Sequence, residues 1–152
     1  MKRSSAPKLL INIMDRNLTT LRQDFAAVSN WQARQKLLLH YSKANKPLDD
    51  ENKIDNNLVG GCEAKVWLTL ERKDDHFLIK ADSDSRIIRG LLVLLLLALN
   101  GLDQQQLADF DLNEYFQSLQ LSHFISTSRI NGLNSILNFI QSKIIELSNN
   151  PL

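Results

Sequence analysis

Alternating apolar and polar residues mark one stretch of the chain as a pair of β-strands. Between residues 65 and 71, the apolar side chains of Val66, Leu68 and Leu70 recur at every second position. This period of two is typical of a half-buried strand. Polar residues 72–75 then indicate a turn, and an apolar run returns at residues 77–81. The pattern predicts a hairpin in which residues 65–71 and 77–82 pair antiparallel.

The most apolar segment of the chain follows this hairpin. Residues 82–85, Asp-Ser-Asp-Ser, are all of types favoured at helix N-termini. Leucine, isoleucine and valine then occupy nearly every side of a helix drawn through residues 85–100, and such a helix must be covered on most of its faces. Gly101 follows Asn100, where a left-handed residue commonly ends a helix. We therefore predict a buried central helix over residues 85–100.

The flanking segments have helical spacing of apolar residues and recognisable end signals. The predicted helices are one that begins at Thr19 or Thr20 as N-cap, one between the cap Asn30 and the stop at Asn45-Lys46-Pro47, and three over residues 103–110, 113–119 and 128–148. Residues 48–57 predict a polar loop, and Leu58-Val59 a short strand. We expect residues 1–17 to form a loosely ordered or helical leader and residues 18–152 one domain. The fold class is then α+β, with a small antiparallel sheet packed against several helices.

Composition and charge narrow the function classes. The 152 residues are 43% hydrophobic and 23% charged, as in soluble globular proteins. The net charge of +1 comes without a basic block, so no nucleic-acid partner is expected. The longest uncharged run, residues 90–102, is shorter than the roughly 20 residues that span a bilayer, so no membrane partner is expected. A single cysteine forms no internal disulfide, which favours a reducing, cytoplasmic location.

Cys62 has the setting that most favours a chemical role. It follows Gly60 and Gly61 and precedes the predicted strand, so its thiol lies at a turn without shielding neighbours. Two interpretations remain open here: a presented, reactive thiol, or a cysteine packed as a small hydrophobic residue. The three histidines are scattered and form no zinc motif, so no metal is expected. A thiol hydrolase would need a histidine that the fold brings to Cys62.

Two charged residues at predicted helix starts are further candidates. Asp84 precedes the apolar helix, where an ordinary role would be interaction with the helix dipole. Arg129 follows Ser126-Thr127-Ser128 at the start of the last helix. A cation is mildly unfavourable there because a helix N-terminus already carries positive partial charge. That cost suggests a tertiary partner for Arg129, although surface arginines at helix starts are also common.

Three blocks of the sequence together resemble the SufE family of cysteine desulfuration proteins, which includes the CsdE branch. They are LVGGCEAKVW at residues 58–67, DSDSRIIRGL at residues 82–91 and STSRINGL at residues 126–133. The blocks have the order and spacing of that family, and the resemblance extends from about Leu18 to the C-terminus. Glu63 and residues 86–89 are closer to the CsdE branch than to SufE proper.

The resemblance implies a fold, a role and a set of residues. The implied fold is a small antiparallel sheet packed on helices, as in IscU-type scaffolds. The implied role is to accept sulfane sulfur from a pyridoxal-phosphate cysteine desulfurase (SufS/CsdA-like), to stimulate that enzyme, and to pass the sulfur to an iron–sulfur scaffold or other acceptor. Cys62 would carry the persulfide, supported by Gly61, Glu63, Asp84 and Arg129. We expect Asp84 and Arg129 on the same side of the molecule as Cys62.

Other properties follow from the same resemblance. The chain would hold no cofactor of its own, because pyridoxal phosphate belongs to the partner desulfurase. It would act as an accessory protein rather than a stand-alone enzyme. The alternatives are a thiol-dependent hydrolase or transferase with Cys62 as nucleophile, and an interaction module in which the cysteine is structural.

Overall fold

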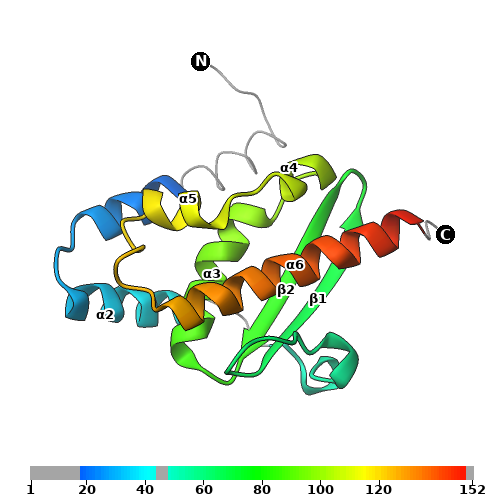
Figure 1. The fold of residues 1–152 in the computed structure, drawn as a ribbon, viewed down its shortest axis with the longest axis horizontal. Helices are drawn as coiled ribbons and strands as arrows, with labels where there is room; N and C mark the ends of the chain where they lie inside the picture. Colours follow the sequence, from blue (N-terminus) through cyan, green and yellow to red (C-terminus); the bar gives the residue numbers. More distant parts are fainter. Residues whose placement is uncertain (1–17, 44–47, 150–152) are drawn as a thin grey trace, which may run out of the picture.

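The computed structural model describes residues 18–43 and 48–149 of the chain. Figure 1 shows a two-stranded antiparallel sheet at one side of the molecule, with the long C-terminal helix crossing one of its faces. After a helix over residues 18–26, the elements are α2 (Trp31–Ser42), the 3₁₀ turns η1 (Asp50–Asn52) and η2 (Asp55–Asn57), strands β1 (Val66–Lys73) and β2 (His76–Ser83), and helices α3 (Arg86–Leu99), α4 (Gln104–Ala108), α5 (Leu112–Ser118) and α6 (Thr127–Asn149). This arrangement confirms the predicted α+β class.

Strands β1 and β2 form the predicted hairpin, with ends within two residues of those expected. They pair antiparallel from Val66 opposite Ser83 to Lys73 opposite His76. The alternation in sequence matches the burial, because Val66 is fully buried and Leu68 is 2% exposed. One face of the hairpin therefore belongs to the hydrophobic core, and the core fixes the register of the strands.

The free edge of β2 is closed by a side chain from the end of α3. The Asn100 amide oxygen accepts a hydrogen bond from the Ile79 backbone N–H at 2.7 Å, and the Asn100 amide nitrogen donates to the Ile79 carbonyl at 3.2 Å. An amide thus takes the place of one residue of a neighbouring strand. Gly101, with φ of 92°, turns the chain away directly afterwards, as predicted from its position.

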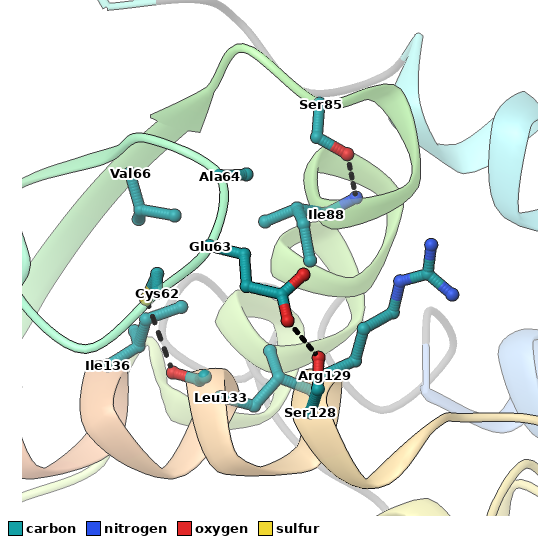
Figure 2. A pocket seen from close by; sticks show the side chains of 11 residues that line it. Cys62, Glu63, Ala64, Val66, Ser85, Ile88, Ser128, Arg129, Leu133 and Ile136 are labelled. Carbon is teal, nitrogen blue, oxygen red and sulfur yellow. Dashed lines mark hydrogen bonds between the residues drawn. The ribbon is translucent and has the colours of Figure 1, made fainter.

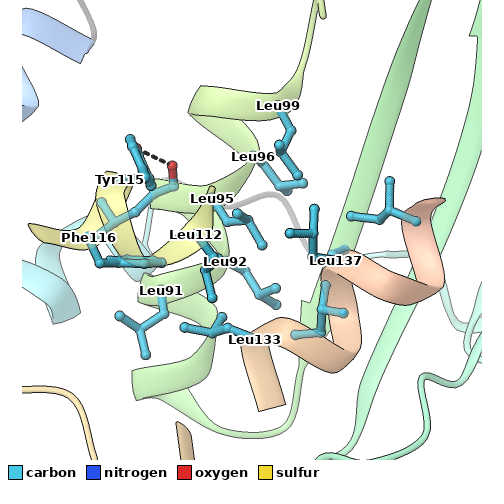
Figure 3. Close-up of a cluster of buried hydrophobic side chains, with 14 of the residues drawn as sticks. Leu91, Leu92, Leu95, Leu96, Leu99, Leu112, Tyr115, Phe116, Leu133 and Leu137 are labelled. Carbon is cyan, nitrogen blue, oxygen red and sulfur yellow. Dashed lines mark hydrogen bonds between the residues drawn. The ribbon is translucent and has the colours of Figure 1, made fainter. Parts of the chain in front are cut away.

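Helix α3 is the central helix of the core. Ser85 is its N-cap, and the Ser85 hydroxyl accepts from the Ile88 backbone N–H at 3.3 Å. Figure 3 shows α3 between two other helices, with Phe116 of α5 on one side and Leu133 and Leu137 of α6 on another. These three side chains are 0%, 1% and 6% exposed, respectively. The prediction of a buried helix over residues 85–100 is confirmed.

One predicted helix boundary near the N-terminus is wrong, and another lies outside the described residues. Thr19 and Thr20 lie inside a helix that already includes Leu18, so neither threonine is its N-cap. Helix α2 begins after the predicted cap Asn30 and its last residue is Ser42, whereas the expected stop at Asn45-Lys46-Pro47 lies outside the described residues. The predicted leader, residues 1–17, lies outside the described residues. Apolar stripes therefore located both helices, and the cap residue located the start of α2 but not that of the first helix.

The segment between α2 and β1 differs from the prediction in two ways. Residues 48–57 contain the two 3₁₀ turns η1 and η2 where a loop with at most one short turn was expected. Leu58 makes a single bridge with Trp67 rather than a strand, and the Val59 backbone N–H donates to the Val66 carbonyl at 2.8 Å. These two contacts fix the chain just before the Gly60-Gly61 turn.

A buried carboxylate ties this segment to the rest of the fold. Asp82, 1% exposed, accepts hydrogen bonds from the backbone N–H groups of Leu48 at 3.1 Å and Ser83 at 2.8 Å. Its two oxygens also lie 3.2 Å from Lys53 Nζ and from Arg89 Nε. Asp82 therefore binds backbone N–H groups and two cationic side chains from separate segments. It is not the capping residue of α3 that its position suggested.

Candidate functional site

Cys62 lies on a loop that packs against α6. We call residues 60–65 the Cys62 loop. The Cys62 side chain is half-buried, and its thiol donates to the Gly132 carbonyl oxygen, with Sγ at 3.6 Å. Gly61 has φ of 84°, a left-handed conformation that side chains other than glycine rarely adopt. The Gly-Gly turn therefore aims the thiol at the helix.

Three consecutive residues of the loop meet three residues along one face of α6. A Cβ built on Gly61 would lie 2.6 Å from Ser135 Oγ, so the loop backbone passes close to that serine. Cys62 contacts Gly132, and the Ser128 hydroxyl donates to Glu63 Oε1 at 2.7 Å. Positions 128, 132 and 135 share one side of a helix. Figure 2 shows the loop above α6 with the hydrogen bonds of Cys62 and Glu63.

A small cavity of about 100 Å³ lies beneath the loop. Apolar side chains from four parts of the chain form much of its wall: Ala64, Val66, Ile88, Leu133 and Ile136. Cys62, Glu63, Ser85, Ser128, Arg129 and Gly132 complete it. Since β1, α3 and α6 are fixed by the core, the loop is the part of the wall that rests on polar and surface contacts.

The surroundings of the thiol favour its neutral form. Burial raises the pKa of the Cys62 thiol above its ordinary value of 9.0, because the thiolate is poorly solvated there. No residue that lines the cavity is a histidine. In Figure 2 the guanidinium of Arg129 extends away from Cys62, so only the stem of that side chain faces the cavity. In this conformation the thiol is held but not activated.

The other predicted site residues fall around the loop. Arg129 lines the cavity, and no carboxylate of the described residues lies within ion-pairing distance of its guanidinium, so the expected tertiary partner is not found there. Asp84 is outside the lining, but its Oδ1 accepts from the Lys65 backbone N–H at 3.1 Å, and its own N–H donates to the Lys65 carbonyl at 3.3 Å. Asp84 thus fixes the end of the Cys62 loop rather than capping α3.

Sequence reasoning missed the surface of α6 that receives the loop. Ser128, Gly132 and Ser135 are small, and their spacing of four and three residues is that of one helix face. The small size of these residues lets a backbone approach closely, and this spacing was the available signal. This spacing did not predict a contact surface, because small polar residues on a helix are usually solvent-facing.

Two classes of site find no support in the structure. In residues 18–43 and 48–149, no group of three or more histidine, cysteine, aspartate or glutamate side chains could hold a metal ion. None of the helices in that part of the chain is both long and apolar enough to cross a bilayer.

Known proteins share this fold and sequence pattern. A solved structure, described as the solution structure of a hypothetical protein from Thermus thermophilus, matches with a TM-score of 0.67. The match covers 90% of this chain and 96% of that one at 14% sequence identity, so it supports the fold alone. The model of the SufE family, described as an Fe-S metabolism associated domain, matches residues 19–144. Because that range is most of the 152 residues, the chain belongs to the SufE family.

Proposed function

We propose that this protein accepts sulfane sulfur from a cysteine desulfurase and carries it as a persulfide on Cys62. The observation that carries this proposal is the single thiol of the chain, held at a glycine turn over a cavity in a domain associated with Fe-S metabolism. In the proposed role the protein also stimulates the desulfurase and delivers the sulfur to an iron–sulfur scaffold or another acceptor.

The transfer is a displacement between sulfur atoms. The Cys62 thiolate attacks the terminal sulfur of the desulfurase persulfide and forms a new S–S bond. The S–S bond within the desulfurase persulfide breaks, and its cysteine leaves as a thiolate that takes up a proton. No net oxidation occurs, and no cofactor of this chain takes part. Pyridoxal phosphate belongs to the desulfurase, where it releases sulfur from cysteine.

The cavity supports the carrier role by its size and lining. Its volume of about 100 Å³ is several times larger than the roughly 10–15 Å³ that holds one water molecule on a similar measure. One additional sulfur atom on Cys62 therefore has room beneath the loop. The apolar wall would keep water and cellular thiols from a bound persulfide. Delivery then requires the loop to leave the cavity, which only the Gly-Gly turn makes easy.

The remaining predicted residues have subordinate roles in this proposal. Arg129 presents a guanidinium without an ionic partner among the described residues, next to the cavity, and is suited to contact the desulfurase. Asp84 holds the end of the loop through Lys65. Glu63 and the run at residues 86–89 favour the CsdE branch of the family. The expected location of this system is the cytoplasm, where thiols stay reduced.

The test of this role is transfer to the protein in solution. A pyridoxal-phosphate cysteine desulfurase and cysteine are incubated with the wild type or with Cys62→Ser, and intact mass is measured before and after reductant. Wild type gains one reducible sulfur atom and Cys62→Ser gains none, because serine keeps the volume but lacks the nucleophile. Wild type also raises desulfurase turnover, since an acceptor removes sulfur from the enzyme's own persulfide.

Two results would contradict the carrier role. If Cys62→Ser stimulated turnover as well as wild type, the protein would act on the desulfurase without carrying sulfur. If neither mass nor turnover changed, the interaction-module alternative would stand. A hydrolase or transferase with Cys62 as nucleophile has no histidine in the cavity lining to serve as its base.

A further inference from the structure

The first turn of α6 receives its negative charge from the Cys62 loop. Helix α6 has 23 residues and no acidic side chain in its own first turn. The Ser126 hydroxyl accepts from the Arg129 backbone N–H at 3.3 Å, so the serine caps the helix in the usual way. Position three of the helix, where a glutamate often completes such a cap, is Arg129 instead. The acid at this helix end is Glu63, bound to Ser128 at 2.7 Å.

Glu63 is therefore attracted to α6 for two physical reasons. Its carboxylate accepts a hydrogen bond from the Ser128 hydroxyl, and a hydrogen bond to a charged group is stronger than one between neutral groups. It also lies at the positive end of the helix dipole, where a carboxylate is stabilised. Both interactions exist only while the Cys62 loop rests on α6.

The other two contacts between loop and helix are weaker. A thiol is a poor donor, and Cys62 Sγ lies 3.6 Å from the Gly132 oxygen. Gly61 meets Ser135 by close approach and not by a hydrogen bond. Both ends of the loop are fixed elsewhere, at Val59 by its bond to β1 and at Lys65 by Asp84. Between those ends, the Glu63–Ser128 hydrogen bond is the strongest polar contact with α6.

We propose that Glu63 and Ser128 are positioning residues that hold the Cys62 loop against α6 and thereby set how often the thiol is accessible. Neither side chain touches the sulfur; they act on the equilibrium between a docked loop and an open one. The proposal concerns the free thiol and stands without a desulfurase. If the sulfur-carrier role holds, the same hydrogen bond also sets the rate at which Cys62 accepts and releases sulfur.

The experiment measures alkylation of the single cysteine by iodoacetamide at neutral pH, followed by intact mass. When opening is fast, the observed rate is the open fraction multiplied by the rate for a free thiol. Ser128→Ala removes the donor without changing any charge and raises the rate about two- to tenfold, as expected from the net strength of one hydrogen bond. Ser128→Thr keeps a hydroxyl and restores the rate to within about twofold of wild type.

The matched control is Ser148→Ala. Ser148 is on the same helix, and its hydroxyl donates to Gln104 Oε1 at 2.9 Å in a similar exposed contact between distant segments. That contact is remote in sequence and structure from the Cys62 loop, so its loss leaves the alkylation rate unchanged. Thermal unfolding of both variants checks that each remains folded and that the rate change is local.

A double-mutant cycle separates the hydrogen bond from the charge of Glu63. Glu63→Ala alone also changes the charge of the Cys62 loop, so it does not isolate the hydrogen bond. If the two residues act as a pair, Ser128→Ala adds little in the Glu63→Ala background. Full additivity, or an unchanged rate in Ser128→Ala, overturns the proposal. Because iodoacetamide replaces the desulfurase, failed sulfur transfer leaves this result intact, and an unchanged alkylation rate leaves the carrier role intact.

Discussion

Two glycines bring backbone close to a helix in this molecule, one in the core and one at the site. On α3, a Cβ at Gly90 would lie 2.5 Å from the Leu38 carbonyl oxygen of α2. On the Cys62 loop, a Cβ at Gly61 would lie 2.6 Å from the Ser135 hydroxyl of α6. The distances are almost equal, but the atoms approached differ. Gly90 faces main chain that is fixed in a helix, whereas Gly61 faces the end of a side chain that can rotate.

The surroundings of the two contacts differ as well: those of Gly90 are buried and apolar, and those of Gly61 are exposed and polar. Gly90 is buried, and α2 and α3 pack there through fully apolar neighbours such as Leu38 and Leu91, 2% and 1% exposed. Gly61 is exposed, and the contacts beside it are hydrogen bonds made by Cys62 and Glu63. A core contact of this kind can separate only when the fold opens. The site contact can separate while the core stays intact, as the proposed sulfur-carrier role requires.

Replacement of Gly90 is the prediction with the largest expected effect, and it tests whether the core contact is as rigid as its surroundings indicate. In Gly90→Ala the new methyl group clashes with the Leu38 carbonyl, and α2 must move away from α3. Overpacking of this kind costs about 1–3 kcal/mol of unfolding free energy. Urea unfolding followed by circular dichroism measures the loss.

Gly132→Ala is its matched control within a helix. A Cβ at Gly132 would lie 3.8 Å from Cys62 Sγ, an ordinary contact, so no clash arises. Alanine is favoured over glycine inside a helix, and the control gains up to about 1 kcal/mol. Equal changes in unfolding free energy in Gly90→Ala and Gly132→Ala would show that the close approach of α2 and α3 at Gly90 does not contribute to stability.

The sequence was sufficient for the elements whose side chains repeat with a clear period. Alternation specified the hairpin and its buried face at Val66 and Leu68, and the run of leucines specified α3 between Ser85 and Asn100. The start of the first helix was placed wrongly, because Leu18 already belongs to it and cap residue types alone do not locate a helix end closely.

The candidate site could be predicted in part, from local motifs rather than from a repeating pattern of side chains. Cys62 was identified from its Gly-Gly setting and from three sequence blocks, and Arg129 lies beside it in the cavity wall. Its partners on α6 were not foreseen, because Ser128 and Ser135 leave no periodic apolar signal. Asp84 was expected near Cys62 from the sequence blocks, but its hydrogen bond with Lys65 across the end of the hairpin was not foreseen. Such pairings depend on how separate elements meet, which local patterns do not encode.

Replacement of Gly61 sharpens the comparison at the site. Gly61→Ala places a methyl group at φ of 84°, which costs about 1–2 kcal/mol for a side chain in the left-handed region. An open loop relieves that cost, so the open fraction rises, and alkylation of Cys62 becomes about five- to thirtyfold faster. The unfolding free energy falls by no more than the same amount, about 1–2 kcal/mol, because only the docked loop, and not the core, is destabilised.

Gly60→Ala is the control for this change. A Cβ at Gly60 meets no atom within 4 Å, so the same substitution one residue earlier leaves both alkylation and stability near wild type. A slower rate in Gly61→Ala would mean that the open loop depends on the left-handed conformation of Gly61 even more than the docked loop does.

The smallest expected effect is a pH dependence confined to the site. Burial raises the pKa of Cys62 in the docked loop above 9.0, whereas the open loop and the unfolded chain keep the ordinary value. The docked form therefore binds its proton more tightly, and docking is fully favoured below the ordinary pKa. As pH rises through the raised pKa, that contribution is lost and the loop opens. The core, which contributes no thiol, is unaffected by this titration.

Alkylation rates measured across this pH range check the prediction. In the wild type, the midpoint of the rate profile lies above that of the same chain unfolded in urea. In Ser128→Ala and Gly61→Ala the midpoint moves down toward the unfolded value, because more of the thiol titrates from the open loop. A wild-type midpoint at or below that of the unfolded chain would show that the docked site stabilises the thiolate. Arg129 would then be the group to replace, because it is the cationic residue among those that line the cavity.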